Sequence, residues 1–432
     1  MNFYNLKHKE EQLNFKEATI KGQGKDKGLF FPEDISKFSN EFLQNLPNLS
    51  NEEIAFQVMK DFAGDEIPEA ELRKIVAETI AFEIPLKKVT ENISVLELFH
   101  GPTLAFKDVG ARFMSRCLGY FLKNETRKVT VLVATSGDTG GAVANGFYDV
   151  EGIEVVILYP KNRVSPVQEK QLTALGKNIH ALEVNGSFDD CQALVKQAFS
   201  DESLNEKLLL TSANSINVAR WLPQQIYYVL ALKQWLKNNS ENPVICVPSG
   251  NFGNICAGIL AHHRGLPVEH FIAACNVNDV VPEYLRTEIL QPKETVATIS
   301  NAMDVGDPSN FVRILELFDK EFNQVKNKLS GYTIDDEETL KTIERVEKDY
   351  GYVLDPHGAV AFVALEKYLA ENGGKGFFLE TAHPVKFPYS VEKATGKSVE
   401  IPKSLEELMM QEKFTTEINS QYEELKGFLL GK

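Results

Sequence analysis

One lysine of this chain stands in a setting that suits covalent chemistry with an aldehyde. Lys107 lies in the sequence HGPTLAFKD, residues 100–108, between an apolar run and an acidic residue. Burial beside the apolar residues 104–106 lowers the pKa of an ammonium group, and the free amine then attacks an aldehyde to form a Schiff base. Because most lysines are solvated surface charges, this reading needs support from residues elsewhere in the chain.

A glycine-rich turn between a strand and a helix is the first support. In residues 242–265, NPVICVP predicts a buried strand, SGNFGN a turn, and ICAGILAHHRG a helix that ends on Gly265. Gly250 and Gly253 let the backbone approach a ligand, and the N–H groups at the start of the helix favour a phosphate. The alternative is an ordinary strand-to-helix turn, which is common in α/β proteins.

Two further polar segments follow predicted strands. The strand Val129–Thr135 continues into a flexible turn at residues 136–141, and the strand Gly376–Glu380 delivers Thr381 and His383 to a loop. Ligands of α/β proteins collect at the carboxyl ends of such strands. The Thr381 hydroxyl can donate to a neutral ring nitrogen, although an ordinary hydroxyl at a strand end is the commoner case.

The elements that must position these residues alternate between strands and helices. The first 95 residues are predicted to be mainly helical: Ser50 and Glu53 form a capping-box pattern, and Pro68 opens a second helix. After about residue 95, short apolar strands alternate with helices, which indicates an α/β fold with parallel sheets flanked by helices. The later predicted strands are Val155–Tyr159, His180–Val184, Val244–Val247, His270–Asn276 and Gly376–Glu380.

The composition excludes some classes of function but does not indicate which enzyme activity the chain has. The chain has 432 residues, 43% hydrophobic and 25% charged, which is typical of a soluble globular protein with more than one domain. A formal charge of -15 argues against nucleic-acid binding, and no run of about eighteen apolar residues predicts a membrane span. Without an apolar leader, the expected location is the cytoplasm.

Metal chemistry has no support in the sequence. The five cysteines form no CxxC pair and are expected to be buried thiols of a reducing compartment. His262 and His263 are adjacent, which is not the spacing of metal ligands on a helix.

Together, the motifs resemble those of one enzyme family. HGPTLAFKD, ATSGDTGGA, YPKNRVSPVQ, NSINVAR, PSGNFGN, SNAMDVGDPSN and TAHPVKF are similar, in the same order, to motifs of the threonine synthases, which are pyridoxal-phosphate (PLP) enzymes of fold type II. The resemblance implies a tryptophan synthase β-like fold with PLP between two α/β subdomains. It divides the chain into an N-terminal domain (1–95), a catalytic region (96–400, with a mobile subdomain at about 110–240) and a C-terminal helical segment (401–432).

The resemblance also assigns residues to the cofactor. Lys107 is expected to form the Schiff base and to move protons, and Thr381 to bond the pyridine nitrogen. Asp138 falls where many relatives have asparagine near the 3′-oxygen, and a carboxylate there is repulsive unless one group is protonated or Asp138 turns away. The loop expected to hold the phosphate consists of Gly250, Asn251, Phe252, Gly253 and Asn254.

The substrate that the resemblance implies is O-phospho-L-homoserine, converted to L-threonine and phosphate. Arg220 can clamp its phosphate bidentately. Ser165 with Gln168 also fits a helix cap, and basic loop residues are usually only solvated. The full set of expected substrate residues is Thr139, Lys161, Arg163, Ser165, Asn214, Ser215 and Arg220.

Two alternatives stay open at this point. The chain can be another PLP lyase of fold type II, such as a threonine or serine dehydratase or a cysteine synthase, which needs no second phosphate site. It can also be a non-catalytic protein that binds phosphorylated metabolites and forms no imine. A monomer or a homodimer is expected, with no nucleic-acid or membrane partner.

Overall fold

The computed structural model describes residues 1–123 and 128–431, which form two compact units. The first unit contains Phe31–Phe106 and Trp221–Glu400, together with Met1. The second unit contains Asn2–Phe30, Lys107–Arg220 and Ile401–Lys432. Each unit is therefore built from segments that are far apart in the sequence.

The first unit is organised around a mainly parallel sheet. Its four inner strands are mostly buried apolar runs, as expected for parallel strands that helices cover on both faces, and its two edge strands are more exposed. Only the edge strand β4 runs antiparallel to its neighbour, β5. In sheet order the strands are β12 (Leu329–Thr333), β11 (His270–Cys275), β10 (Val244–Pro248), β13 (Gly376–Glu380), β5 (Ile93–Glu97) and β4 (Leu86–Lys88).

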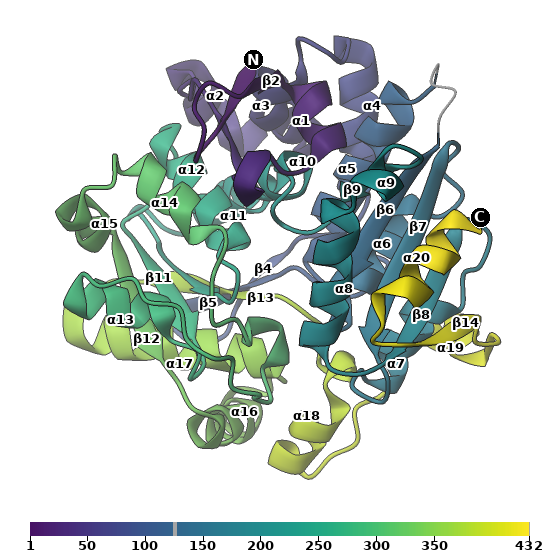
Figure 1. The fold of residues 1–432 in the computed structure, drawn as a ribbon. Coiled ribbons are helices and arrows are strands. Elements are labelled where there is room, and N and C mark those ends of the chain that lie inside the picture. The colour runs from purple at the N-terminus through teal and green to yellow at the C-terminus, as the bar shows by residue number, and fades with distance from the viewer. Residues whose placement is uncertain (124–127, 432) are drawn as a thin grey trace. The chain divides into compact units, whose positions relative to one another are not determined.

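Helices lie on both faces of this sheet, with α11 and α12 on one side and α16 and α17 on the other (Figure 1). The helices of the unit are α2 (Asn40–Asn45), α3 (Asn51–Ala63), α4 (Glu69–Thr79), α11 (Gln225–Trp235), α12 (Gly253–His263), α13 (Val280–Thr287), α14 (Phe311–Leu317), α15 (Phe322–Lys328), α16 (Asp336–Tyr350), α17 (Pro356–Asn372) and α18 (Pro388–Thr395). Short 3₁₀ turns are η2 (Leu46–Asn48), η3 (Leu222–Gln224), η4 (Asn301–Met303) and η5 (Pro384–Lys386).

The second unit contains a parallel sheet whose central strand, β7, pairs with β6 and β8. Helices α8 and α20 lie in front of it in Figure 1, and α6 lies behind. The strand order is β14 (Thr415–Asn419), β8 (Ile179–Asn185), β7 (Ile153–Pro160), β6 (Val129–Ala134) and β9 (Leu209–Ser212).

The helices of the second unit include α5, which begins at Lys107, and α6, which begins at Asp138. Strands β1 (Asn2–Asn5) and β2 (Gln12–Asn14) form an antiparallel pair near the start of the chain, and β3 (Phe30–Pro32) and α10 (Val218–Trp221) lie where the chain changes units. The remaining elements are α1 (Phe15–Lys21), η1 (Lys25–Lys27), α5 (Lys107–Phe121), α6 (Asp138–Phe147), α7 (Pro166–Thr173), α8 (Phe188–Ser200), α9 (Glu202–Asn205), α19 (Lys403–Met410) and α20 (Tyr422–Leu430).

The α/β class and the predicted strands are confirmed, and the helices opened by Ser50 and Pro68 begin where predicted. The last thirty residues differ from the expected helices, because β14 lies between α19 and α20. This strand is short and mostly exposed, so it lacks the apolar run that reveals buried strands. The predicted division into domains at residues 95 and 400 stays a prediction.

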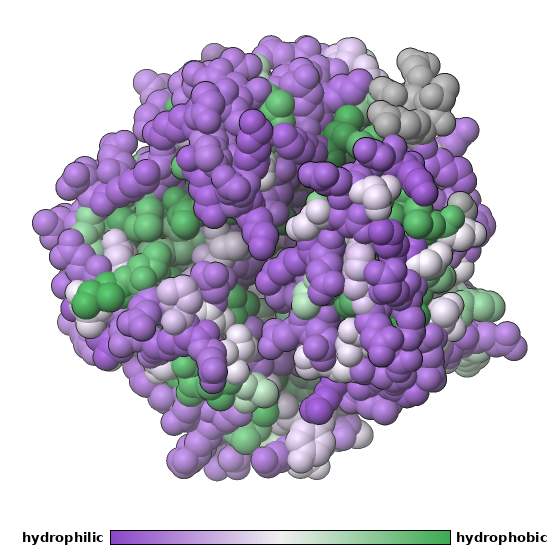
Figure 2. All heavy atoms as spheres, in the orientation of Figure 1, coloured by the Kyte–Doolittle hydropathy of each residue, from purple (hydrophilic) through white to green (hydrophobic). Residues whose placement is uncertain are grey.

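The surface carries polar and apolar side chains in unequal shares. The face in Figure 2 is largely hydrophilic, with apolar side chains in separate groups. Large exposed apolar side chains include Met410, Tyr389 and Ile289. Among residues 1–123 and 128–431, no helix is long and apolar enough to cross a membrane.

The core of the first unit gives a test of its packing. Phe362 on α17 is fully buried and meets Phe378 of β13 edge to face, with ring centroids 5.6 Å apart. Replacing Phe362 by alanine should destabilise the fold by about 3–5 kcal/mol, because it removes this contact and leaves a cavity. A lower urea midpoint checks this, and the exposed Glu371→Ala on the same helix is the control, expected within about 0.5 kcal/mol of wild type. Equal midpoints for both variants would contradict the packing role.

Candidate active site

Three loops leave the carboxyl ends of adjacent strands in the first unit. Strands β10, β13 and β5 are neighbours in the sheet and run parallel. Their carboxyl ends therefore share one edge, where ligands of α/β proteins bind. The loops begin at Ser249, Thr381 and Leu98, and each contains one of the motifs selected from the sequence.

The loop after β10 presents backbone and side-chain N–H groups of the kind that suit an anion. Phe252 adopts a left-handed conformation with φ of 60°, and α12 starts at Gly253, so the first N–H groups of the helix face the loop. Asn254 is buried, and its Oδ1 accepts a hydrogen bond from the Tyr228 hydroxyl at 2.6 Å. Its Nδ2 has no hydrogen-bond partner among the described residues. A buried N–H without a partner beside a helix start matches the need of a phosphate oxygen.

Gly250 and Asn251 join this loop to residues 301–310. A Cβ on Gly250 would lie 2.6 Å from the Met303 Cα, so only glycine fits at this position. The Asn251 Oδ1 accepts hydrogen bonds from the Ser309 N–H at 2.8 Å and the Ser309 hydroxyl at 2.7 Å. The loop at residues 249–253, called the phosphate-type loop below, is thus held by a second motif, SNAMDVGDPSN at residues 300–310.

The loop after β13 fixes the residue that precedes Lys107. The Phe106 N–H donates to the Thr381 carbonyl at 2.9 Å, and Ala105 and Ala382 form an isolated bridge. The Tyr227 hydroxyl also donates to the Phe106 carbonyl. Lys107 follows directly as the first residue of α5, so its backbone starts from a well-anchored position.

Lys386 is a further contact between these two loops that sequence reasoning missed. Its side chain is fully buried, and Nζ donates to the Thr103 carbonyl at 2.9 Å. The His383 N–H donates to the Leu104 carbonyl at 3.0 Å. A lysine inside the apolar stretch TAHPVKF was the sign in the sequence that its side chain is buried. Its hydrogen-bond partner could not be predicted, because Thr103 lies 283 positions away in the chain.

Ionisable groups behind these loops are paired. Burial acts to raise the pKa of Glu97, but hydrogen bonds from His100 and Lys87 outweigh it and lower the pKa overall. Burial, aided by His100, lowers the pKa of His383 to about 4. The His383 Nδ1 accepts from the Val385 N–H at 3.1 Å, which also requires the neutral ring.

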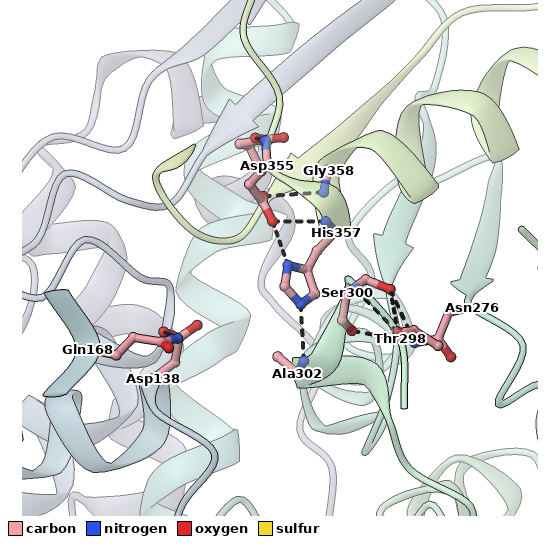
Figure 3. Close-up of polar contacts among 10 residues, drawn as sticks. Asp138, Gln168, Asn276, Thr298, Ser300, Ala302, Asp355, His357 and Gly358 are labelled. Atoms are coloured by element: carbon pink, nitrogen blue, oxygen red, sulfur yellow. Dashed lines mark hydrogen bonds and ion pairs between the residues drawn. The ribbon is translucent and has the colours of Figure 1, made fainter. Parts of the chain in front are cut away.

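In the second unit, the turn after β6 is closed by its own side chains. The Thr135 Oγ1 accepts from the N–H groups of Gly137 and Gly140, at 3.0 and 2.9 Å. Asp138 is buried at the start of α6, and its Oδ1 accepts from the Gln168 Nε2 at 2.9 Å (Figure 3). The helix start and the Gln168 amide both stabilise this carboxylate. The expected role of Asp138 at the cofactor 3′-oxygen stays a prediction.

The predicted substrate residues of this unit fall into two local groups. Ser165 and Gln168 form the capping box that starts α7, as the sequence allowed, and Gln168 links this turn to Asp138. Thr139 follows Asp138 on α6. Lys161 forms an ion pair with Glu417 of β14 at 2.8 Å, and Arg163 is exposed.

The motif NSINVAR forms the other group. Arg220 is buried, and its Nη1 donates to the Ala213 carbonyl. Asn214 directly follows Ala213, and its Oδ1 is buried without a hydrogen-bond partner among the described residues. Ser215 follows and is half-buried. The motif therefore holds a buried cation against the carbonyl of the residue that precedes Asn214.

Other candidate sites are weaker. A surface hollow of about 550 Å³ lies at the amino ends of β11 and β12, away from the loops described above. Its polar groups bond one another, as in the 2.8 Å contact of His270 Nε2 with Ser330 Oγ. Among the residues that the structure describes, no three His, Cys, Asp or Glu side chains gather as metal ligands. The thiols are all buried, as predicted, and belong to Cys117, Cys191, Cys246, Cys256 and Cys275.

Comparison with known proteins defines the class first. The family model described as "Pyridoxal-phosphate dependent enzyme" matches residues 80–377. This range contains the loops described above, apart from the loop after β13 that begins at Thr381. Models described as "Threonine synthase N terminus" and "Threonine synthase, C-terminal" match residues 2–80 and 358–429. The protein is a PLP-dependent enzyme of fold type II.

Individual relatives give the family. A threonine synthase of Haemophilus influenzae is 45% identical over 430 residues, covering 100% of both chains. The crystal structure of threonine synthase from Escherichia coli matches with a TM-score of 0.93 at 45% identity and covers 100% of both chains. The structure of PLP-bound threonine synthase from Brucella melitensis also has a TM-score of 0.93, at 35% identity and 99% and 98% coverage. The chain belongs to the threonine synthase family, which confirms the resemblance found in its motifs.

The residues present fit the cofactor of this family. The unpaired Nδ2 of Asn254 and the helix start at Gly253 suit its phosphate. Gly250 permits the close backbone approach that such a loop needs. Thr381 is buried directly after β13, where its hydroxyl can serve a ring nitrogen.

The low pKa of His383 predicts an acid-sensitive first unit. With a folded pKa of about 4 against about 6.5 unfolded, stability is present above pH 6.5 and is lost as pH falls toward 4. Each such histidine adds up to about 1.4 kcal/mol per pH unit to that slope. His383→Asn keeps an acceptor for the Val385 N–H but cannot titrate, so urea midpoints measured at pH 7 and pH 5 should differ less than in wild type. An unchanged difference would contradict a buried neutral His383.

Proposed function

We propose that this enzyme makes L-threonine and phosphate from O-phospho-L-homoserine and water. The observation that carries the proposal is the match to threonine synthases along the whole chain, including the regions at residues 2–80 and 358–429. In the net reaction, the Cγ–O bond breaks and phosphate leaves with its electron pair. A water oxygen bonds to Cβ, which loses one hydrogen, while Cγ gains one.

PLP, when bound, supplies an electron sink for the carbanions that this reaction needs. Lys107 holds it covalently and moves protons at the substrate carbons. The loop Gly250–Asn254 binds its phosphate through backbone N–H groups and the Asn254 amide. The Thr381 hydroxyl leaves the ring nitrogen unprotonated, which makes a weaker sink and favours β- and γ-chemistry over transamination.

The substrate phosphate needs a second anion site, which we assign to the motif NSINVAR. Arg220 is a buried guanidinium, the group best suited to bidentate contact with phosphate. The unpaired end of the Asn214 amide can present an N–H to the same anion after a half-turn of the side chain. Ser215 adds a hydroxyl, and Thr139, Lys161, Arg163 and Ser165 are the further candidates for contact with the substrate.

We further propose that the reaction takes place in the cytoplasm. The support is the set of free, buried cysteines, which suits a reducing compartment. A monomer or a homodimer stays the expectation for assembly.

The covalent role of Lys107 is tested with the purified protein and Lys107→Ala. Wild type should show a visible absorbance band that borohydride bleaches, and should release threonine and phosphate in equal amounts from O-phospho-L-homoserine. Lys107→Ala should lose the band and at least about 1,000-fold in kcat, because both covalent and proton-transfer roles are removed. A band without phosphate release would identify another PLP lyase, and no band would remove the PLP assignment.

The second phosphate site is tested at Arg220. Arg220→Ala should raise KM for O-phospho-L-homoserine by about tenfold or more while the visible band is kept, since a charged hydrogen bond contributes about 1.5–3 kcal/mol. Arg220→Lys keeps the charge and should show a smaller increase. The control is Lys128→Ala, because Lys128 pairs at the surface with Glu154 in the same unit. An unchanged KM in Arg220→Ala would place the substrate phosphate elsewhere.

A further inference from the structure

Beyond the groups assigned to cofactor and substrate, the first unit contains a buried carboxylate–imidazole pair. Asp355 is the N-cap of α17, and its carboxylate accepts from the N–H groups of His357 at 2.8 Å and Gly358 at 3.2 Å. The same carboxylate is hydrogen-bonded to the His357 Nδ1. Both side chains are buried, with 0% and 2% of their surface exposed. No step of the proposed reaction uses this pair.

The far side of the His357 ring contacts the turn η4. Its Nε2 lies 3.2 Å from the Ala302 backbone nitrogen, as Figure 3 shows. A backbone N–H only donates, so Nε2 is the acceptor and the ring proton is on Nδ1, toward Asp355. The carboxylate thus fixes both the orientation and the tautomer of the ring, as second partners of histidines do at metal sites.

The turn held by His357 packs directly on the phosphate-type loop. A Cβ on Gly250 would lie 2.9 Å from the Ala302 carbonyl oxygen and 2.6 Å from the Met303 Cα, so the two backbones are in contact. Asn251, the next residue, is bonded to Ser309 further along the same segment. Movement of the turn therefore displaces the backbone N–H groups of the loop.

The other end of the turn is fixed independently. The Asp304 carboxylate accepts from the Thr298 hydroxyl at 2.7 Å, the Thr298 N–H at 3.0 Å and the Asn276 amide at 2.9 Å. Asn276 directly follows β11, so Asp304 attaches the turn to the sheet. Ala302 lies two residues before this attachment, and its own N–H is bonded to His357, which fixes it beside Gly250.

Asp355 also connects this arrangement to the loop of Thr381. The Asp355 N–H donates to Glu380 Oε1 at 2.6 Å, and Glu380 directly precedes Thr381. Burial, and after it the neighbouring Asp355, raises the pKa of Glu380 well above its usual value. Asp355 therefore contacts both His357, which holds the turn, and the residue that precedes Thr381.

We infer that His357, oriented by Asp355, is a positioning residue that holds the turn 301–303 against Gly250 and so fixes the loop that binds the cofactor phosphate. The part concerning phosphate rests on the proposed function. The part concerning the turn depends only on the contacts of His357 with Ala302 and Asp355.

Two matched substitutions separate the two contacts of the ring. In His357→Gln, the side-chain oxygen reaches the Nε2 position and can still accept from the Ala302 N–H. In His357→Asn, the amide reaches only the Nδ1 position, which keeps the contact with Asp355 and leaves the Ala302 N–H without its acceptor. Gln should therefore rescue what Asn loses, which a role in general packing would not produce.

The experiment measures hydrogen exchange and PLP release on the full-length holoenzymes. In His357→Asn, exchange of the amides in residues 300–310 and the rate of PLP release on dilution should both rise by about tenfold, since the buried Ala302 N–H loses its acceptor. In His357→Gln, both should stay within about threefold of wild type. Amides of α6, in the other unit, should not change in either variant.

Other results overturn the inference. Exchange at 300–310 that is unchanged in His357→Asn, or equally fast in both variants, would show that the ring does not position the turn. If neither His357 variant folds, Asp355→Asn decides, because loss of the carboxylate frees the tautomer and should raise the same exchange by at least about threefold. An unchanged rate there also overturns it. If wild type carries no PLP, the proposed function fails, while the exchange data still decide the role of His357.

Discussion

The pairing of two loop backbones at the exit of β13 is the constraint on which the site depends. Lys107 is a flexible side chain, so its usefulness requires that its backbone be fixed. The hydrogen bond from the Phe106 N–H to the Thr381 carbonyl fixes the residue before Lys107. The buried Lys386 adds a second bond between the same loops, to the Thr103 carbonyl. The two motifs follow the neighbouring strands β5 and β13, which pair in parallel with Val95 opposite Phe378. The positions of these two loops thus depend on the pairing of the strands that precede them.

The phosphate-type loop follows the same logic with a different device. No strand neighbour fixes it, since it turns immediately from β10 into α12. Its shape comes from a second segment, residues 301–310, that contacts Gly250 and binds Asn251. That segment in turn needs attachments at Asp304 and His357, because an irregular backbone has no ladder of its own. Side-chain hydrogen bonds, not strand pairing, therefore hold this segment in place.

What the sequence could predict follows from where the information lies. Strands such as β10 and β13 are continuous apolar runs, and the helix caps at Ser50 and Ser165 are local patterns, so all were predictable. The family motifs also selected Lys107 and the Gly250 loop as site candidates, and their roles stay predictions. The contacts of Lys386 and of His357 join residues 283 and 55 positions apart, and no local period signals them. Strand β14 was missed because an exposed edge strand carries little apolar pattern.

Strand β14 has a consequence for how the chain is made. Its residues pair in parallel with β8, with Thr415 opposite Ala181 and Asn419 opposite Asn185. On the ribosome, β8 is complete more than 200 residues before its neighbour exists, so one long edge of that sheet must wait with its N–H and C=O groups unpaired. Open edges invite wrong partners while a chain is being synthesised. The sheet of the second unit is therefore completed only when β14 has been made, although its other four strands end by Ser212.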